Sequence, residues 1–253
     1  MEADKAILIE VFGESSGSEE EEGSQPKSRY CWERFGEIKG LWLCRDFLST
    51  QRQSSLLSAI QNEGWFSEAS NNQAMRFGEL QPWAIEISDS IRDAVISSHQ
   101  DVDLDHPMEL GSCNGLHEAS PFPFPSHLLS RNPLFDQLIV NLYHPGEGIC
   151  AHVDLMRFED GIAIVSLESS CVMHFNRVDE GTTSDKDHDN AQSMNMKIPV
   201  YLTPGSLVLM YGEARYVWKH EINRKPGFQK WKGQELQQKR RISITLRKLA
   251  QVD

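Results

Sequence analysis

Residues 138–154 read LIVNLYHPGEGICAHVD, and this stretch decides the predicted fold. Its first part is β-branched, aliphatic and aromatic, the central HPGEG segment contains Pro and Gly, and an extended run resumes at Ile149. We therefore predict a strand, a turn and a second strand. Because side chains two residues apart in a strand project to the same side, His152 and Asp154 are expected to project together. A histidine and a carboxylate held in this way are two of the three ligands of a non-haem Fe(II) facial triad.

The chain holds a second His-x-Asp sequence, so this spacing alone does not identify a metal site. His99 and Asp101 end an amphipathic helical stretch and enter an acidic run, with no buried strand around them. We interpret this second pair as the solvated end of a helix.

The composition indicates one substantial core and no membrane association. The 253 residues are 39% hydrophobic and contain no run of eighteen apolar residues. No basic flank precedes the short apolar stretch at the N-terminus, so we expect neither a transmembrane helix nor a secretory signal. Five scattered cysteines without a Cys-x-x-Cys pair indicate reduced thiols in an intracellular protein of the cytoplasm, the nucleus or both.

The formal net charge of −12 is partly concentrated near the N-terminus. Residues 1–29 are rich in Glu, Gly and Ser, which predicts a disordered acidic tail ahead of a folded domain at 30–253. The tail is either a solubilising arm or a segment that binds a protein partner. The overall charge argues against non-specific coating of nucleic acid, but it does not exclude a local basic patch.

Most of the folded part alternates short strand-like runs with turns. Helices are predicted at 50–62 and from Pro82 onward, with a loop between them at 64–78. Short strands are predicted at 40–44, 138–143, 149–155, 161–167, 171–175, 197–202, 206–211, 217–222 and 241–246. Because strands and helices do not alternate, we predict a mainly β protein: an antiparallel double sheet, or jelly roll, with helices packed on one face.

The last predicted strand carries an unusual polar face. Arg241 and Arg247 are six residues apart, so they face the same side, together with Ser243 and Thr245. The opposite face is aliphatic. A polar side of this kind is typical of a strand that lines a cavity holding a dianion.

Several segments together resemble a known family. NLYHPGEG followed by HVD, then GEARYVWKH and RISITLR, are similar to motifs of the AlkB-type Fe(II)/2-oxoglutarate dioxygenases. The resemblance covers residues 65–249, is tightest from Asn141 on, and is closest to the AlkB homologues that act on wobble uridines of tRNA. It implies a double-stranded β-helix that uses Fe(II), 2-oxoglutarate and O₂. It also implies that His152, Asp154 and His220 bind the iron.

The same resemblance assigns a 2-oxoglutarate site. It implies that Asn141, Tyr143, Arg241 and Arg247 hold this co-substrate, with the arginines on its two carboxylates. Ser243 stands where many members of the family have Asn, and a hydroxyl can still donate a hydrogen bond. Arg215 resembles an active-site Arg that precedes the distal His; a structural role is the alternative.

Two stretches are candidates for substrate contact. Residues 224–241 contain seven Lys or Arg, one Glu and two aromatic residues, and we expect them beside the mouth of the cavity. From this stretch we single out Lys230, Trp231 and Lys232; the alternative is an exposed loop. Arg76 and Phe77, in the predicted loop between the helices, could stack on a base or could plug the core.

Three functions are compatible with these residues. The first is demethylation or hydroxylation of modified bases in nucleic acid, either tRNA or a single strand, with RNA slightly favoured over DNA. The second is the same oxidation of a protein side chain, which the negative charge favours. The third is a non-catalytic β-helix that only binds.

Overall fold

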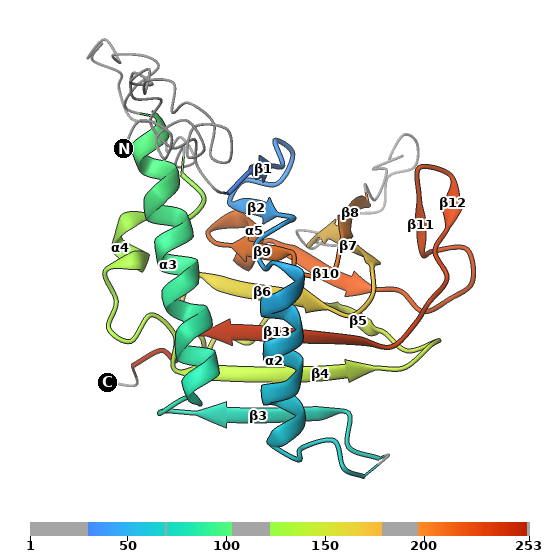
Figure 1. Ribbon diagram of the computed structural model, residues 1–253. Helices are drawn as coiled ribbons and strands as arrows, with labels where there is room; N and C mark the ends of the chain where they lie inside the picture. The colour runs from blue at the N-terminus through green and yellow to red at the C-terminus, as the bar shows by residue number, and fades with distance from the viewer. Residues whose placement is uncertain (1–29, 69, 103–121, 179–196, 252–253) are drawn as a thin grey trace, which may run out of the picture.

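Two antiparallel β-sheets packed face to face form the centre of the molecule, and helices cover the outer face of the larger sheet (Figure 1). The computed structural model describes residues 30–68, 70–102, 122–178 and 197–251. The larger sheet has the strand order β1 (Trp32–Arg34), β2 (Leu41–Cys44), β9 (Leu207–Met210), β6 (Ile162–Leu167), β13 (Arg241–Arg247), β4 (Gln137–Tyr143) and β3 (Gln73–Phe77). The smaller sheet has the order β5 (Ile149–His152), β10 (Trp218–Ile222), β7 (Cys171–Arg177) and β8 (Ile198–Leu202). A separate hairpin consists of β11 (Lys230–Trp231) and β12 (Gln234–Glu235).

The two long helices, α2 (Thr50–Asn62) and α3 (Pro82–Val102), pack on the larger sheet. Ser49 caps the N-terminus of helix α2: its hydroxyl accepts a hydrogen bond from the backbone N–H of Arg52 at 3.4 Å. Short helices lie at α4 (Ser126–Leu129) and α5 (Glu213–Tyr216). Among the described residues, no helix has the length and apolar character needed to cross a membrane.

Strands β6 and β13 lie in the middle of the larger sheet and are buried on both faces. In β6, Ala163, Val165 and Leu167 pack toward the helices, whereas Ile162 and Ile164 join the core between the sheets. In β13, the residues with even numbers pack toward the helices, so the residues with odd numbers face the space between the sheets. The polar face predicted for β13 therefore lines the interior of the jelly roll.

The predicted fold class, an antiparallel jelly roll with helices on one face, is confirmed. One prediction is wrong: the expected loop at 64–78 contains strand β3, which pairs with β4 along its whole length at the edge of the larger sheet. The sequence QAMRF has little β-branched character, so it is extended because of its partner strand rather than its own preference. The predicted strand 149–155 is also too long, since β5 ends at His152.

Other predictions fall wholly or partly outside the described residues. These are the acidic tail at 1–29, most of the loop-like segment at 101–125, and the side chains of His99 and Asp101.

Candidate active site

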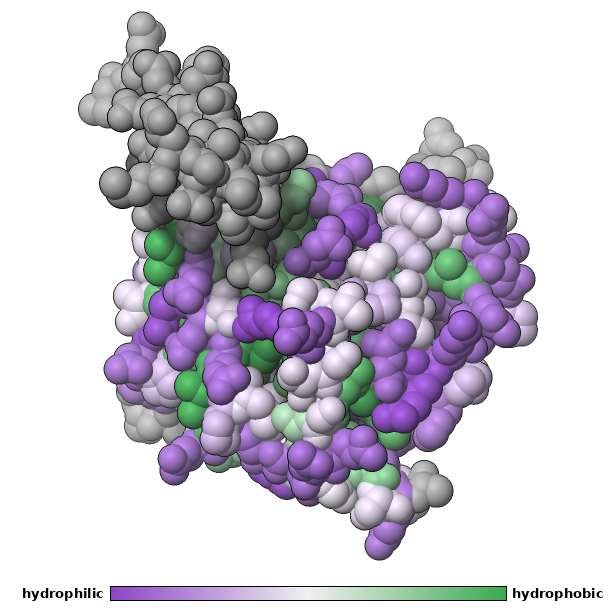
Figure 2. Space-filling view, viewed as in Figure 1, coloured by the Kyte–Doolittle hydropathy of each residue, from purple (hydrophilic) through white to green (hydrophobic). Residues whose placement is uncertain are grey.

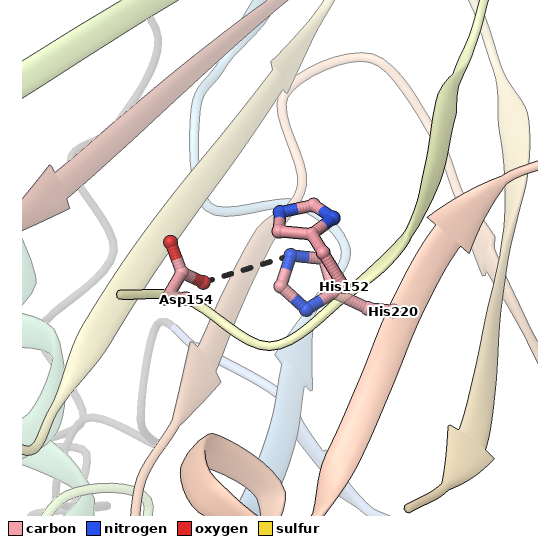
Figure 3. A group of neighbouring side chains, drawn as sticks. All are labelled: His152, Asp154 and His220. Carbon is pink, nitrogen blue, oxygen red and sulfur yellow. Dashed lines mark ion pairs between the residues drawn. The ribbon is translucent and has the colours of Figure 1, made fainter. Parts of the chain in front are cut away.

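Two histidines and one aspartate converge between the sheets (Figure 3). His152 ends β5, His220 lies on β10, and the two residues are direct partners in the antiparallel register. Their ring centroids are 4.4 Å apart. Asp154 follows β5, and its Oδ2 lies 3.7 Å from Nε2 of His220. One nitrogen or oxygen atom from each of the three residues falls within 4.8 Å of the others, which fits a single metal ion.

The protonation states also suit metal binding. Burial lowers the pKa of His220 to about 4, although Asp154 partly counteracts it, so the ring is neutral at pH 7. Nδ1 of His152 lies 2.8 Å from the carbonyl oxygen of Cys150. A proton on Nδ1 would donate to that carbonyl and leave the Nε2 lone pair free for a ligand bond. Two histidines and one acidic residue are the donor set of non-haem Fe(II) sites.

Arg215 fixes the loop that carries Asp154. Its side chain is 1% exposed, and its Nη1 donates to the carbonyl of Asp154 at 2.9 Å. Its Nη2 donates to the carbonyls of Leu155, at 2.8 Å, and Phe158, at 3.3 Å. These donors bind backbone oxygens of the loop that carries Asp154. This contact corresponds to a structural role for Arg215, the alternative given above.

The polar face of β13 carries a guanidinium group at each end, and one of them contacts this cluster. Nη2 of Arg247 pairs with Oδ1 of Asp154, and Nη1 donates to Oε1 of Gln137 at 3.3 Å. At the other end of the strand, Nε of Arg241 donates to the hydroxyl of Ser166 at 3.0 Å. Nη1 and Nη2 of Arg241 are buried and have no hydrogen-bond partner among the described residues. Since buried donors normally have a hydrogen-bond acceptor, these two nitrogen atoms are suited to bind an acceptor such as a carboxylate.

Neighbouring strands complete the surroundings of Arg241. Its guanidinium carbon lies 5.5 Å from the ring centroid of Tyr143, whose pKa is raised by burial, so the phenol stays protonated and can donate. Oδ1 of Asn141 accepts a hydrogen bond from Nε2 of Gln73 at 2.7 Å. The buried Ser243 is paired in register with Asn141 on one side and Ser166 on the other. A cation and several neutral donors at one end, with a metal cluster and a second cation at the other, fit a small dicarboxylate that also reaches the metal.

The candidate substrate residues on β3 point in opposite directions. Arg76 turns toward the helices, where its guanidinium carbon lies 4.5 Å from the ring centroid of Trp65. Phe77 faces the other side, is 47% exposed, and lies 5.5 Å from the guanidinium carbon of Arg157. Around this contact are further exposed apolar side chains, which together with Phe77 we call the rim: Met75, Leu155 and Met156. Leu155 and Met156 follow Asp154 directly, so the rim borders the metal cluster.

The basic candidates Lys230, Trp231 and Lys232 lie elsewhere. They belong to the β11–β12 hairpin, and Trp231 stacks on Tyr201 of β8 with the ring centroids 5.3 Å apart and the planes at 13°. Strand β8 is at the opposite edge of the smaller sheet from β5, which carries His152. The stretch 224–241 is thus divided: Gln229, Gln238 and Lys239 line a small pocket together with Tyr143 and Arg241, whereas the hairpin itself is held on β8 by a contact between residues distant in sequence.

Sequence reasoning missed three residues of the site. Ser166 could have been recognised as a polar residue in an otherwise aliphatic buried strand. Gln137 shares the parity of Asn141 and Tyr143 and could have been found in the same way. Gln73 carried no signal, because its role depends on the pairing of β3 with β4.

Comparisons with known proteins agree with this geometry. The sequence profile of the 2OG-Fe(II) oxygenase superfamily matches residues 40–247. The chain is 31% identical over 184 residues to the tRNA (carboxymethyluridine(34)-5-O)-methyltransferase alkbh8 of Xenopus tropicalis, covering 72% of this chain and 25% of that protein. It is 30% identical over 230 residues to the alkylated DNA repair protein ALKBH8 homolog of Arabidopsis thaliana, covering 84% of this chain and 59% of that protein. The chain thus spans only part of these relatives.

The fold is also found among solved structures. The structure of OsALKBH1 superimposes with a TM-score of 0.52 and 13% sequence identity, over 86% of this chain and 100% of that chain. At this identity, the similarity concerns the fold alone.

Proposed function

Because the chain belongs to the 2OG-Fe(II) oxygenase superfamily, we propose that it oxidises modified bases in nucleic acid, with RNA favoured over DNA. The cofactors of this dioxygenase domain are Fe(II), 2-oxoglutarate and O₂. When bound, they supply one oxygen atom to a substrate C–H bond while 2-oxoglutarate becomes succinate and CO₂. Hydroxylating an N-methyl group gives a hemiaminal that loses formaldehyde, whereas hydroxylating a side-chain carbon leaves the alcohol.

The proposed roles of the residues follow from their positions. His152, Asp154 and His220 would hold the iron, which would supply the oxidising chemistry when 2-oxoglutarate and O₂ are present. Asp154 is positioned for this by two arginines, since Arg247 pairs with its carboxylate and Arg215 holds its backbone carbonyl.

The observation that carries the oxygenase chemistry of the proposal is the pair of unsatisfied donors on Arg241. A buried guanidinium with two free N–H groups, at the end of the interior opposite Arg247, is a site for one carboxylate of 2-oxoglutarate. Arg247 is placed for the other carboxylate, next to the metal. Tyr143, Asn141 and Ser243 supply neutral donors along the same face.

The nucleic-acid substrate is supported by the relatives and by the rim. One relative is named for a modified uridine of tRNA and the other for alkylated DNA repair. Phe77 presents an exposed ring beside the guanidinium of Arg157. An aromatic face next to a cation can hold an unstacked base and its phosphate.

A protein side chain is the second candidate substrate. The net charge of −12 and the apolar rim favour it, because a peptide would meet less repulsion than a polyanion. The non-catalytic alternative is disfavoured, since all three metal-binding side chains are present and close together.

Succinate formation distinguishes these substrates. The purified protein, with Fe(II), ascorbate and 2-oxoglutarate, is incubated with total tRNA, methylated single-stranded DNA or a protein extract. The proposal predicts that tRNA stimulates succinate release most and that mass spectrometry of its nucleosides reveals the oxidised base. Stimulation by the protein extract alone would refute the proposed substrate. The matched control is Asp154→Asn, which removes a metal-binding charge at nearly constant volume.

We also propose that the protein works in the cytoplasm or nucleus, where such substrates are found, and that the acidic segment 1–29 binds a protein partner. Imaging of a fluorescent fusion, and affinity purification with and without residues 1–29, test these two proposals.

A further inference from the structure

The β11–β12 hairpin and its flanking residues carry a cluster of basic and aromatic side chains. The hairpin lies on β8, away from the metal cluster, whereas the flanking Lys239 lines a small pocket with Tyr143 and Arg241. Residues 224–240 carry six Lys or Arg and one Glu, in a chain whose net charge is −12. Five of the six cations are exposed and form no ion pair with another described residue: Arg224, Lys225, Lys230, Lys232 and Lys239. The sixth, Arg240, pairs with Glu168. Cations clustered without acidic partners attract a polyanion.

The hairpin is held rigidly on the smaller sheet. The buried side chain of Gln229 accepts a hydrogen bond from the backbone N–H of Val172 at 2.8 Å and donates to its carbonyl at 3.0 Å. In this way it takes the place of a neighbouring strand beside β7. Trp231 stacks on Tyr201, which faces outward because Val200 and Leu202 on either side are in the core. The hairpin therefore presents its side chains on the outer face of the smaller sheet.

The tip of the hairpin places a lysine in an uncommon conformation. Lys232 and Gly233 form a two-residue turn in which both φ angles are positive, 50° and 82°. Such turns favour Asn-Gly, and a residue with a long side chain is uncommon at positive φ. Strain of this kind is often associated with function, and here it fixes a cation at the exposed tip.

Aromatic side chains accompany these cations. Phe228 is 38% exposed, and Nζ of Lys197 lies 5.4 Å from its ring centroid. At the upper right of Figure 2, where Figure 1 places β11 and β12, hydrophilic residues surround residues of intermediate hydropathy and some hydrophobic residues. Cations alternating with aromatic rings are the combination that binds a single-stranded polynucleotide through phosphate contacts and stacking.

We propose that the β11–β12 hairpin binds single-stranded nucleic acid at a second site, which holds the strand while a distant nucleotide lies at the metal cluster. This inference rests on the proposed nucleic-acid substrate. Three strand spacings separate His152 on β5 from Tyr201 on β8, and two separate His220 on β10 from it, so the hairpin is about 10–14 Å or more from the metal-binding histidines at ~4.8 Å per spacing. A stacked strand needs about four nucleotides or more to span this, at ~3.4 Å each. A shorter substrate therefore occupies only one of the sites.

Binding of fluorescent oligouridylate tests the proposal. The full chain, with Fe(II) and 2-oxoglutarate but without O₂, is titrated with a strand of about 20 nucleotides, longer than the site sizes common for single strands. Fluorescence anisotropy is recorded at several salt concentrations. In Lys230→Glu/Lys232→Glu, the slope of log K against log salt should fall by about 1.4, or ~0.7 per lost phosphate contact. A trinucleotide should lose less affinity than the long strand.

A second variant tests stacking, and a third controls for charge. Trp231→Ala should weaken binding about fivefold to a hundredfold, as for one stacked base, and Trp231→Phe should restore part of the loss. The control Lys39→Glu/Arg52→Glu makes the same charge change away from the hairpin. Its affinity should change by less than about twofold, because charges beyond the ~8 Å screening length act weakly. Circular dichroism confirms that each variant is folded.

The outcomes separate this inference from the proposed function. If the lysine variant and the control bind equally while the wild type still oxidises a base in RNA, the second site is wrong and the function stands. If the hairpin binds RNA but only protein is oxidised, the function is wrong and the nucleic-acid site stands. If the wild type binds polyglutamate but no oligouridylate, the surface binds acidic protein and the inference is wrong.

Discussion

Replacing each of two buried arginines by methionine should have very different effects on stability. In Arg241→Met, two buried donors without partners disappear, and each costs about 1–3 kcal/mol in the wild type. The variant also loses the hydrogen bond to Ser166, worth roughly 1.5–3 kcal/mol for a charged donor. Without ligand, these ranges combine to a change between about 1 kcal/mol of destabilisation and about 4.5 kcal/mol of stabilisation, with stabilisation covering most of the range.

The same change at Arg215 should destabilise the protein strongly. Arg215→Met removes three hydrogen bonds to backbone carbonyls, and its unpaired Nε offsets only part of that loss. We expect a decrease of roughly 3 kcal/mol or more in the free energy of unfolding. At about 2–4 °C per kcal/mol for a domain of this size, the melting temperature should fall by roughly 6 °C or more.

Thermal unfolding with Fe(II), without O₂, measures both variants with and without 2-oxoglutarate. At a hundred times its Kd, the ligand should stabilise the wild type by about 2.7 kcal/mol. In Arg241→Met, the loss of two charged hydrogen bonds should weaken binding by about a hundredfold or more and nearly abolish this shift. The reasoning is refuted if Arg241→Met keeps the ligand-induced shift, or if without ligand it loses as much stability as Arg215→Met.

Three further predictions concern the rim, the edge strand and a buried thiol. Phe77→Ala should raise KM for the nucleic-acid substrate about fivefold or more, as expected for a lost stacking contact; an unchanged KM in steady-state succinate assays would exclude that contact. Gln73→Leu removes the donor to Asn141 and should weaken 2-oxoglutarate binding by about tenfold, the effect of one hydrogen bond of ~1 kcal/mol or slightly more; calorimetry measures it, and unchanged affinity would argue against a role for this pair. Burial raises the pKa of Cys44 from 9.0 to about 12, so the unfolded thiol loses its proton first and stability should fall as pH rises from 9 to 12. Urea unfolding at several pH values measures this loss of stability. The contribution of the Cys44 thiol to it should be absent in Cys44→Ala.

The interior of the site was largely predictable because strand parity is a local property. The spacing from Arg241 to Arg247 places both arginines on one face, whatever the neighbouring strands. His152 and Asp154 come together for a different reason than expected, since β5 ends between them and hydrogen bonds from Arg215 shape the loop.

The features that could not be predicted depend on partners distant in sequence. Strand β3 is extended because it pairs with β4, and its own residues give little indication of it. The hairpin lies on β8 because Trp231 stacks on Tyr201, thirty residues earlier in the chain. For Arg215, the sequence left a substrate-contacting and a structural role open, because its acceptors are backbone carbonyls, which the sequence does not reveal.

Equilibrium dialysis with Fe(II) under anaerobic conditions tests the central claim most directly. The wild type should bind one Fe(II) per chain, more tightly when 2-oxoglutarate is present, because the two ligands share one site. His220→Ala should lose metal binding. Arg241→Met should still bind Fe(II), but 2-oxoglutarate should no longer increase its affinity for the metal. Unchanged metal binding in His220→Ala, or an equal gain from 2-oxoglutarate in Arg241→Met, would contradict the account.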